Sequence, residues 1–244
     1  MSRTVNRVTI IGGSLAGASA AFALRDAGFT GSVTLIGEEQ HLPYERPPLS
    51  KAYLRGEEPA AQAEVRPGAA YETMDVELIR GHRAVTIDRD ARIVELDDDR
   101  HMRYDALILA TGASPRRLSV TRGYLAGVHY LRTRDHADAL RSAAATASNI
   151  VVIGGGWIGT ETAASLRQMG ANVTLVTNLD YPLERVLGAE IGAIYREYFP
   201  ADPPARATVG VRPQPLSILD AKDANTPPVV AAGALPDTVG TDRY

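Results

Sequence analysis

The chain has 244 residues, 45% hydrophobic and 23% charged, which suits one large or two small globular domains. Its formal net charge of −3 gives no broad basic field, so neither nucleic acid nor an acidic membrane surface is an expected partner. The absence of cysteine excludes thiol catalysis, redox disulfides and cysteine-ligated clusters, and is typical of a cytoplasmic protein.

The chain opens with a strand, a glycine-rich turn and a helix. The strand is predicted at Arg7–Ile11, and an alanine-rich helix runs over Ala16–Ala27 to a C-cap at Gly28. A second apolar strand follows at Val33–Ile36. Because both strands are continuously apolar and a helix joins them, we expect an α/β fold with a parallel sheet covered on both faces.

The middle of the chain is predicted to be a small β excursion. Residues 37–70 are irregular and proline-rich, with a short helix from Pro48. The predicted strands and hairpin arms are Val76–Arg80, Ala84–Asp88, Ile87–Leu96 and Tyr104–Ala110. We expect the last of these to rejoin the first sheet.

The second half repeats the opening order of elements. Thr133 is expected to cap a helix that ends near Ala145. Further strands and helices are predicted at Asn149–Ile153, Trp157–Met169, Val173–Val176 and Val186–Phe199. After Phe199 no periodicity is long enough for an element, and residues 200–244 hold eight of the chain's fifteen prolines. This tail is predicted to be mostly disordered.

Two glycine-rich turns are copies of each other. Ile10–Gly17 (IIGGSLAG) and Val151–Gly159 (VVIGGGWIG) each stand between a strand and a helix. The matching positions are Gly12 with Gly154, Gly17 with Gly159, Leu24 with Leu166 and Gly28 with Gly170. One such turn is a weak signal, but two copies in the same frame predict two dinucleotide sites.

In the first turn, Gly12 permits a tight bend and Gly17 lets the helix pack closely on the strand. Ser14 replaces the middle glycine, and its hydroxyl is expected to bond a phosphate held on the helix N-terminus. Glu38, at the end of the second strand, suits a carboxylate that binds a ribose diol. The alternative is a set of packing glycines with a surface glutamate.

The second turn has all three glycines of the G-x-G-x-x-G pattern, at Gly154, Gly156 and Gly159. We expect these glycines and Ile158 to bind the cofactor. The strand beyond its helix ends in the neutral pair Thr177–Asn178 rather than in an acid. The turn therefore predicts a nicotinamide nucleotide site and leaves both NADH and NADPH open. Arg185 is the nearest candidate for a 2′-phosphate, but as one of many arginines it is better explained as a solvated surface residue.

The chain resembles the FAD-dependent, NAD(P)H-using reductases of ferredoxins and rubredoxins, which supply electrons to oxygenase and cytochrome P450 systems. The resemblance covers residues 5–199, and the run PYERPPLSK is its most specific part. The other matching motifs are IIGGSLAG, LIGEE, LILATGASP, YLRT, VVIGGGWIG and YPLERVLGAEIG.

The resemblance implies roles for matching residues. The positions implied to contact FAD or line its groove are Ala16, Glu38, Arg46, Pro47, Lys51, Val85, Thr111, Gly112 and Arg132. Lys51 is implied to lie near the flavin, paired with Glu161, where the pair would favour the reduced flavin and place the nicotinamide. The alternative is that Lys51 and Glu161 are ordinary solvent-facing charges. The implied cofactors are FAD and NAD(P)H, and the implied acceptor is a ferredoxin or rubredoxin-like protein.

The resemblance also indicates what is not found. The family's returning FAD segment with a Gly-Asp motif and its C-terminal domain are not recognisable here. We therefore expect an FAD-binding Rossmann-like domain at 1–118, a partial NAD(P)-binding one at 119–199 and an irregular tail at 200–244, both domains incomplete. A non-catalytic nucleotide-binding remnant and another flavin reductase, such as an NADH oxidase, remain as alternatives.

No metal site is expected. The five histidines, at positions 41, 82, 101, 129 and 136, have no partner at metal-ligand spacing in the sequence. There is no visible signal peptide, and no apolar run approaches the ~20 residues that span a bilayer.

Overall fold

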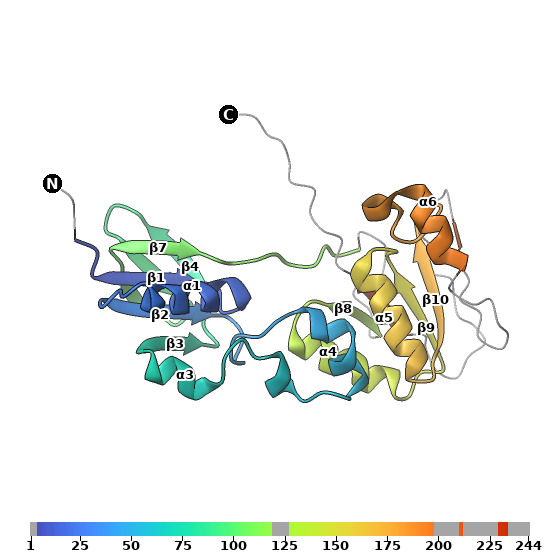
Figure 1. Ribbon diagram of the computed structural model, residues 1–244, viewed down its shortest axis with the longest axis horizontal. Helices are drawn as coiled ribbons and strands as arrows, with labels where there is room; N and C mark the ends of the chain where they lie inside the picture. Colours follow the sequence, from blue (N-terminus) through green and yellow to red (C-terminus); the bar gives the residue numbers. More distant parts are fainter. Residues whose placement is uncertain (1–3, 119–126, 198–209, 212–228, 234–244) are drawn as a thin grey trace. The chain divides into compact units, whose positions relative to one another are not determined.

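A computed structural model describes residues 4–118 and 127–197, together with the strand residues 210–211 and 229–233. Two compact units make up the chain (Figure 1). The first contains the residues up to Glu45 and Ala60–Ala113, and the second contains Arg46–Pro59 and the residues from Ser114 onward. The division near residue 113 lies close to the expected boundary at 118, but the Arg46–Pro59 segment groups with the second unit.

A four-stranded parallel sheet forms the centre of the first unit, in the order β3-β2-β1-β7. Its strands are β1 (Arg7–Ile11), β2 (Ser32–Gly37), β3 (Val76–Arg80) and β7 (Ala106–Leu109). The first unit also contains helices α1 (Leu15–Asp26) and α3 (Gly68–Thr73) and a 3-10 turn at Ala60–Ala63. This arrangement confirms the predicted α/β fold with a parallel sheet.

Alternation along the strands divides the first unit's core between the two faces of the sheet. Ile10 and Leu35 pack with Phe22 of α1 on one face. Ile11 and Ile36, one residue further along each strand, pack on the opposite face. Successive side chains of a strand point to opposite faces, so neighbouring residues serve two cores.

An antiparallel three-stranded sheet covers the second face. Its strands are β4 (Ala84–Asp88), β5 (Ile93–Leu96) and β6 (His101–Arg103). The predicted hairpin is confirmed, and its turn is held by Asp88, whose Oδ1 accepts the N–H groups of Asp90 and Ala91. Strand β6 and helix α3 were not predicted, because each is very short.

Arg25 ties the end of α1 to the segments that follow it. Its side chain, 9% exposed, donates to the backbone oxygens of Phe29, Gly31, Met74 and Asp75 at 2.6–2.8 Å. Four carbonyl dipoles thus face one buried guanidinium. The side chain therefore fixes both the α1–β2 turn and the end of α3.

We expect Arg25→Met to destabilise the first unit by about 3 kcal/mol, because hydrogen bonds to a charged group contribute ~1.5–3 kcal/mol each and are not additive. Urea unfolding followed by circular dichroism measures the change. Arg100→Met removes a 44%-exposed arginine of the same unit and serves as the control, with an expected loss below ~1 kcal/mol. Equal losses in the two variants would contradict the role given to Arg25.

A parallel sheet also forms the centre of the second unit, in the order β11-β10-β9-β12-β8. Its strands are β8 (Val128–Leu131), β9 (Asn149–Ile153), β10 (Asn172–Thr177), β11 (Gly210–Val211) and β12 (Val229–Gly233). Its helices are α2 (Ala52–Arg55), α4 (Arg134–Ala144), α5 (Trp157–Gln168) and α6 (Glu184–Glu197), the last interrupted at Gly188.

The expectation that residues 200–244 contain no element is wrong for two described segments. Strand β12 pairs with both β9 and β8, and β11 pairs with β10. Runs of five and two residues are too short for a periodicity to show in the sequence. The rest of the predicted tail lies outside the described residues.

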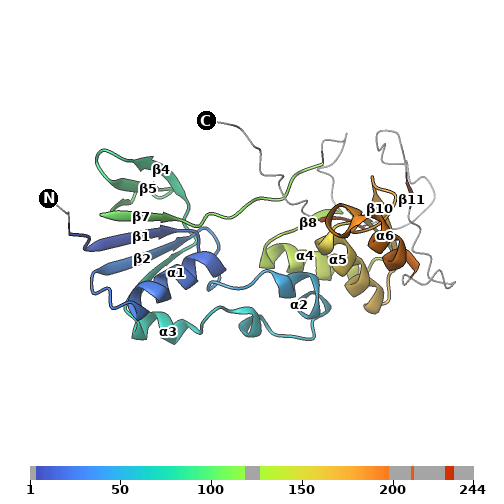
Figure 2. The same ribbon diagram turned by 45° about the horizontal axis from the view of Figure 1, so that its top comes forward.

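The Arg46–Pro59 segment, which includes a 3-10 turn at Pro47–Ser50 and helix α2, is fastened to α4 (Figure 2). Tyr53 donates its hydroxyl proton to Asp138 Oδ1 at 2.8 Å. Arg141 donates to the same oxygen at 2.8 Å and to the Tyr53 carbonyl at 3.0 Å. The predicted cap of α4 is confirmed, since Thr133 Oγ1 accepts from the His136 N–H.

None of the helices among the described residues is long and apolar enough to cross a membrane.

Candidate functional site

The first glycine-rich turn lies at the carboxyl ends of β1, β2 and β7. Gly12 has φ +122°, and its N–H donates to the Ile36 carbonyl at 2.8 Å. A Cβ on Gly12 would lie 2.0 Å from the Ala110 oxygen, and one on Gly17 would lie 2.0 Å from the Gly12 oxygen. Both glycines are therefore required by backbone packing, as the sequence predicts.

Helix α1 begins directly after this turn with Ser14 as N-cap. The Ala18 N–H is the first to bond back, to the Ser14 carbonyl, so the N–H groups of residues 15–17 have no acceptor within the helix. Leu15 and Ala16 are exposed, so this helix end is open to an anion. The Ser14 hydroxyl is not aimed there, because it donates to the Tyr44 carbonyl at 3.2 Å. The expectation that this hydroxyl bonds a phosphate stays a prediction.

The other predicted residues of the first unit lie after β2, after β7 and on β4. Glu38 is exposed immediately after β2, where a ribose-binding carboxylate is expected. Thr111 and Gly112 are exposed after β7, and the Gly12 packing places the Ala110–Thr111 peptide against the turn. Val85 lies on β4 of the second sheet and is 54% exposed.

The three glycines of the second turn have different surroundings: Gly154 and Gly159 pack against the protein backbone, and Gly156 faces open space. Gly154 has φ +114°, and its N–H donates to the Val176 carbonyl at 2.8 Å, as Gly12 does to Ile36. A Cβ on Gly159 would lie 1.8 Å from the Gly154 oxygen. A Cβ on Gly156 would meet no described atom within 4 Å. Gly156 is thus the glycine whose missing side chain leaves room for a ligand rather than for the protein.

One peptide group of this turn is oriented by the loop after β10. The Leu183 N–H donates to the Gly155 carbonyl at 2.7 Å. In a trans peptide the N–H points opposite to the carbonyl, so the Gly156 N–H points away from Leu183. Leu183 is 1% exposed and has φ +60°, an uncommon conformation for a non-glycine residue. The Thr160 N–H is the first in α5 to bond back, to the Gly156 carbonyl, so this peptide and the N–H groups of residues 157–159 are donors of the kind that bind phosphate groups at a helix N-terminus.

The end of β10 carries no acid. Thr177 is buried and accepts the Leu179 N–H at 3.2 Å, so it belongs to the turn rather than to a ligand surface. Asn178 and Arg185 are both exposed. Neither residue has a described contact that favours NADH over NADPH.

Lys51 and Glu161 form an ion pair in the second unit. The Lys51 Nζ lies 2.7 Å from Glu161 Oε2, and Lys51 also donates to the Pro47 carbonyl at 3.2 Å. The side chains are 46% and 28% exposed, so water screens the pair in part. Glu161 stands on the first turns of α5, two residues after Gly159. The pair is therefore present beside the second glycine turn.

The remaining predicted residues of this unit are close to Lys51 in the chain or bonded to its segment. Arg46 donates to the Arg132 carbonyl at 2.6 Å, which joins the Arg46–Pro59 segment to the residue after β8. Ile158 is half-buried on α5. The residues implied to contact FAD are thus divided between the two units: Arg46, Pro47, Lys51 and Arg132 belong to the second.

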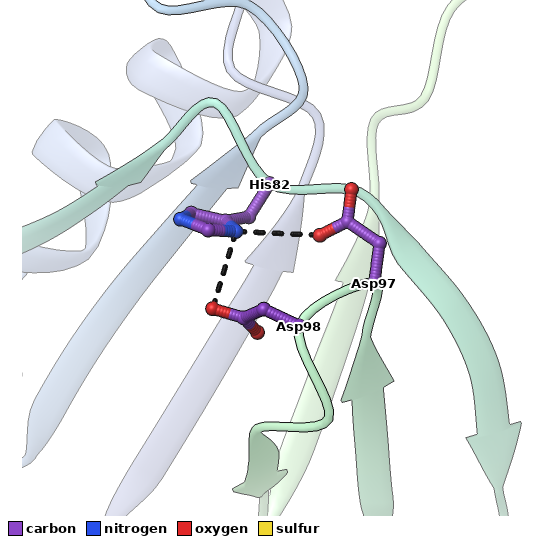
Figure 3. Close-up of side chains that lie close together, drawn as sticks. All are labelled: His82, Asp97 and Asp98. Carbon is purple, nitrogen blue, oxygen red and sulfur yellow. Dashed lines mark hydrogen bonds and ion pairs between the residues drawn. The ribbon is translucent and has the colours of Figure 1, made fainter.

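A cluster of His82, Asp97 and Asp98 was not predicted (Figure 3). The His82 Nδ1 lies 3.3 Å from a carboxylate oxygen of each aspartate. Arg100 donates to the same Asp98 Oδ2 at 2.7 Å. Desolvation raises the pKa of the Asp98 carboxyl, but the hydrogen bonds and charge of Arg100 outweigh it and hold that pKa below its usual range.

The sequence spacing around His82 gives no sign of this cluster, and the expectation that the chain has no metal site stays a prediction. The three residues lie on the β3–β4 connection and on the β5–β6 turn, too far apart in the sequence for a spacing rule. Their geometry could hold a metal ion, but Arg100 already neutralises an oxygen that would ligate it. As it stands, the cluster is a set of polar contacts among His82, the two aspartates and Arg100 that joins the two connections.

Sequence reasoning missed two positioning contacts at the second turn, those of Ser50 and Leu183. Ser50 Oγ donates to Glu161 Oε2 at 2.6 Å across 111 residues of sequence. Its place directly before Lys51 was the available signal. Leu183 gave none, because its role depends on its backbone.

Residues 6–202 match the family described as Pyridine nucleotide-disulphide oxidoreductase. The chain belongs to this family. Members of the family use FAD and NAD(P)H. The chain is 45% identical over 188 residues to rhodocoxin reductase from Rhodococcus erythropolis, and 39% identical over 193 residues to putidaredoxin reductase from Pseudomonas putida. These matches cover 77% and 78% of this chain, but 44% and 46% of the relatives.

The chain is also similar to solved structures of reductases. A covalent putidaredoxin reductase–putidaredoxin complex matches 79% of this chain and 47% of that one, with a TM-score of 0.75 and 38% identity. A ferredoxin reductase from Rhodopseudomonas palustris matches 94% of this chain and 58% of that one, with a TM-score of 0.83 and 35% identity. The chain thus spans about half the length of its curated relatives and shares their fold over that part.

Proposed function

We propose that this chain supplies the nucleotide-binding part of a ferredoxin-type reductase. Electrons would pass from NAD(P)H through FAD to an iron–sulfur protein of the ferredoxin or rubredoxin type. The observation that carries the proposal is the duplicated turn: each copy opens onto unpaired helix N–H groups, one in each unit. The similarity to rhodocoxin and putidaredoxin reductases supports the choice of acceptor. We also place the protein in the cytoplasm, in line with its lack of cysteine.

The residues of the two turns would act by binding and orientation. The N–H groups at the start of α1 would hold the FAD pyrophosphate, and Glu38 would bind a ribose diol. The Gly156 N–H and the start of α5 would hold the pyrophosphate of the coenzyme. When bound, FAD and NAD(P)H supply the hydride and electron chemistry.

The Lys51–Glu161 pair would place the nicotinamide end of the coenzyme. Lys51 offers a cation with a partly exposed side chain, and Glu161 holds that cation in one position. A group held within a few tenths of an ångström of its working position contributes far more to rate than a mobile one. The pair therefore acts by position and charge, with no bond made to either residue.

Flavin content of the purified chain tests the proposal. We expect the protein to be yellow or to become so with added FAD, and NADH or NADPH to bleach the colour. Addition of an oxidised ferredoxin should restore it. A colourless protein that takes up no FAD would contradict the proposal for this chain, whereas bleaching without reoxidation by ferredoxin would contradict only the proposed acceptor.

A further inference from the structure

Glu161 is held by two donors on the same oxygen. Its Oε2 accepts from Lys51 Nζ at 2.7 Å and from Ser50 Oγ at 2.6 Å. Ser50 is 4% exposed, whereas the Lys51 side chain is 46% exposed. The hydroxyl is therefore the drier of the two donors, and a hydrogen bond to a carboxylate is stronger where water is excluded.

Helix α5 holds Ser50 from two positions one turn apart. Glu161 accepts the Ser50 hydroxyl proton, and Ser165 Oγ donates to the Ser50 carbonyl at 2.7 Å. Residues four apart on a helix share a face, so one face of α5 is hydrogen-bonded to both the side chain and the backbone of Ser50. Ser165 is 1% exposed.

The direction of the Ser165 hydroxyl is set by Arg55. Arg55 NH1 donates to Ser165 Oγ at 3.2 Å, and a guanidinium has no acceptor. The Ser165 proton is therefore free to point at the Ser50 carbonyl. The backbone of Ser50, and with it that of the adjacent Lys51, is fixed on α5.

We propose that Ser50 is a positioning residue that sets the orientation of the Glu161 carboxylate and, through it, of the Lys51 ammonium group. Ser165 assists by fixing the Ser50 backbone. The inference rests on the proposed function only in that it treats the Lys51–Glu161 pair as part of the nicotinamide site. Without the hydroxyl, Glu161 would keep one donor on a flexible, half-exposed side chain, and the carboxylate would rotate.

The chain's two lysines, Lys51 and Lys222, allow a direct test. In protein labelled with ¹³C at lysine Cε, Lys222→Arg identifies the Lys51 signal. A held ammonium group gives its two Hε protons different chemical shifts, and a freely rotating one gives an averaged shift. We expect the wild type to show the difference, and both Ser50→Ala and Glu161→Gln to lose it.

Three further variants separate the hydroxyl from packing. Thr146→Ala removes an exposed hydroxyl that donates to the Ala143 carbonyl near the end of α4, and should leave the Lys51 signal unchanged. Ser50→Thr keeps a hydroxyl at the site and should keep the shift difference. Ser165→Ala should weaken the difference without abolishing it. Fluorescence of Trp157, the one tryptophan, shows that each variant is folded.

Coenzyme binding is the second readout. We expect the FAD-loaded Ser50→Ala protein to bind NADH or NADPH about tenfold more weakly, as for the loss of one charged hydrogen bond. A folded Ser50→Ala protein that keeps the Lys51 shift difference would overturn the proposal, and so would a loss of the difference in Ser50→Thr. A wild type that binds no coenzyme would contradict the proposed function, while the lysine signal would still decide the role of Ser50.

Discussion

Gly159→Ala should disrupt the second nucleotide turn, while Gly156→Ala, three residues earlier, should leave the fold intact and weaken coenzyme binding. The reason is the space at each position. A Cβ on Gly159 would lie 1.8 Å from the Gly154 oxygen, and one on Gly156 would meet no described atom within 4 Å. The obstacle at Gly159 is backbone, which cannot rotate aside.

We expect Gly159→Ala to cost about 3 kcal/mol or more, the upper end of what overpacking costs, because β9 and α5 must separate. Gly156→Ala should cost less than ~1 kcal/mol, since alanine is only a poorer N-cap than glycine. Urea unfolding followed through Trp157, at the start of α5, measures both.

Coenzyme affinity provides the complementary result. A methyl group at Gly156 would occupy the space where the pyrophosphate must approach, so NADH and NADPH affinity should fall by about tenfold or more. Tight coenzyme binding by Gly156→Ala would show that the pyrophosphate does not use this turn. A Gly159→Ala protein as stable as the wild type would show that the close approach of α5 and β9 is not required.

These glycine roles could be read from the sequence because they are local. A φ beyond +100° at Gly154 and the close packing at Gly159 follow from the order strand, turn, helix, whatever else the chain does. The repeat at Gly12 and Gly17 strengthens the reading, and the structure shows the same backbone bond in both copies. The hairpin at Asp88 and the cap at Thr133 were also predictable, since each depends on neighbouring residues.

Pairings between distant segments could not be predicted in this way. Strand β12 lies between β9 and β8 in the sheet, and the sequence of this five-residue apolar strand does not indicate which strands it pairs with. The grouping of the Arg46–Pro59 segment with the second unit depends on Tyr53 meeting Asp138 and Ser50 meeting Glu161. Such contacts are set by the packing of α2 on α4 and α5, which no sequence period records.

The contact between Lys51 and Glu161 is another pairing of distant segments that the residue pattern alone does not predict. The two residues taken alone are ordinary surface charges, and only the resemblance to ferredoxin reductases implied that they meet. The structure places them 2.7 Å apart in one unit. Substitution of each partner tests the contribution of this contact to flavin reduction.

Glu161→Gln should slow the reduction of bound FAD by NADH or NADPH by about a hundredfold, the scale expected when a reacting group is displaced by ~1 Å. The amide keeps the shape of the side chain and can still accept from Ser50, but it no longer holds the Lys51 charge in place. Because the lysine is 46% exposed, its release into water should change the free energy of unfolding by less than ~1 kcal/mol. Stopped-flow absorbance of the flavin measures the rate, and urea unfolding measures the stability.

Asp98→Asn is the control. It removes the carboxylate of an ion pair in the first unit, with Arg100 at 2.7 Å, where the Asp98 side chain is 34% exposed and has no contact with the Ser50–Glu161 network among the described residues. Flavin reduction in this variant should match the wild type. Lys51→Met should slow reduction about as much as Glu161→Gln, and the double variant should be no slower than either, because each change removes the same interaction. If the two losses instead multiply, Lys51 and Glu161 act independently, and the ion pair is not the functional unit.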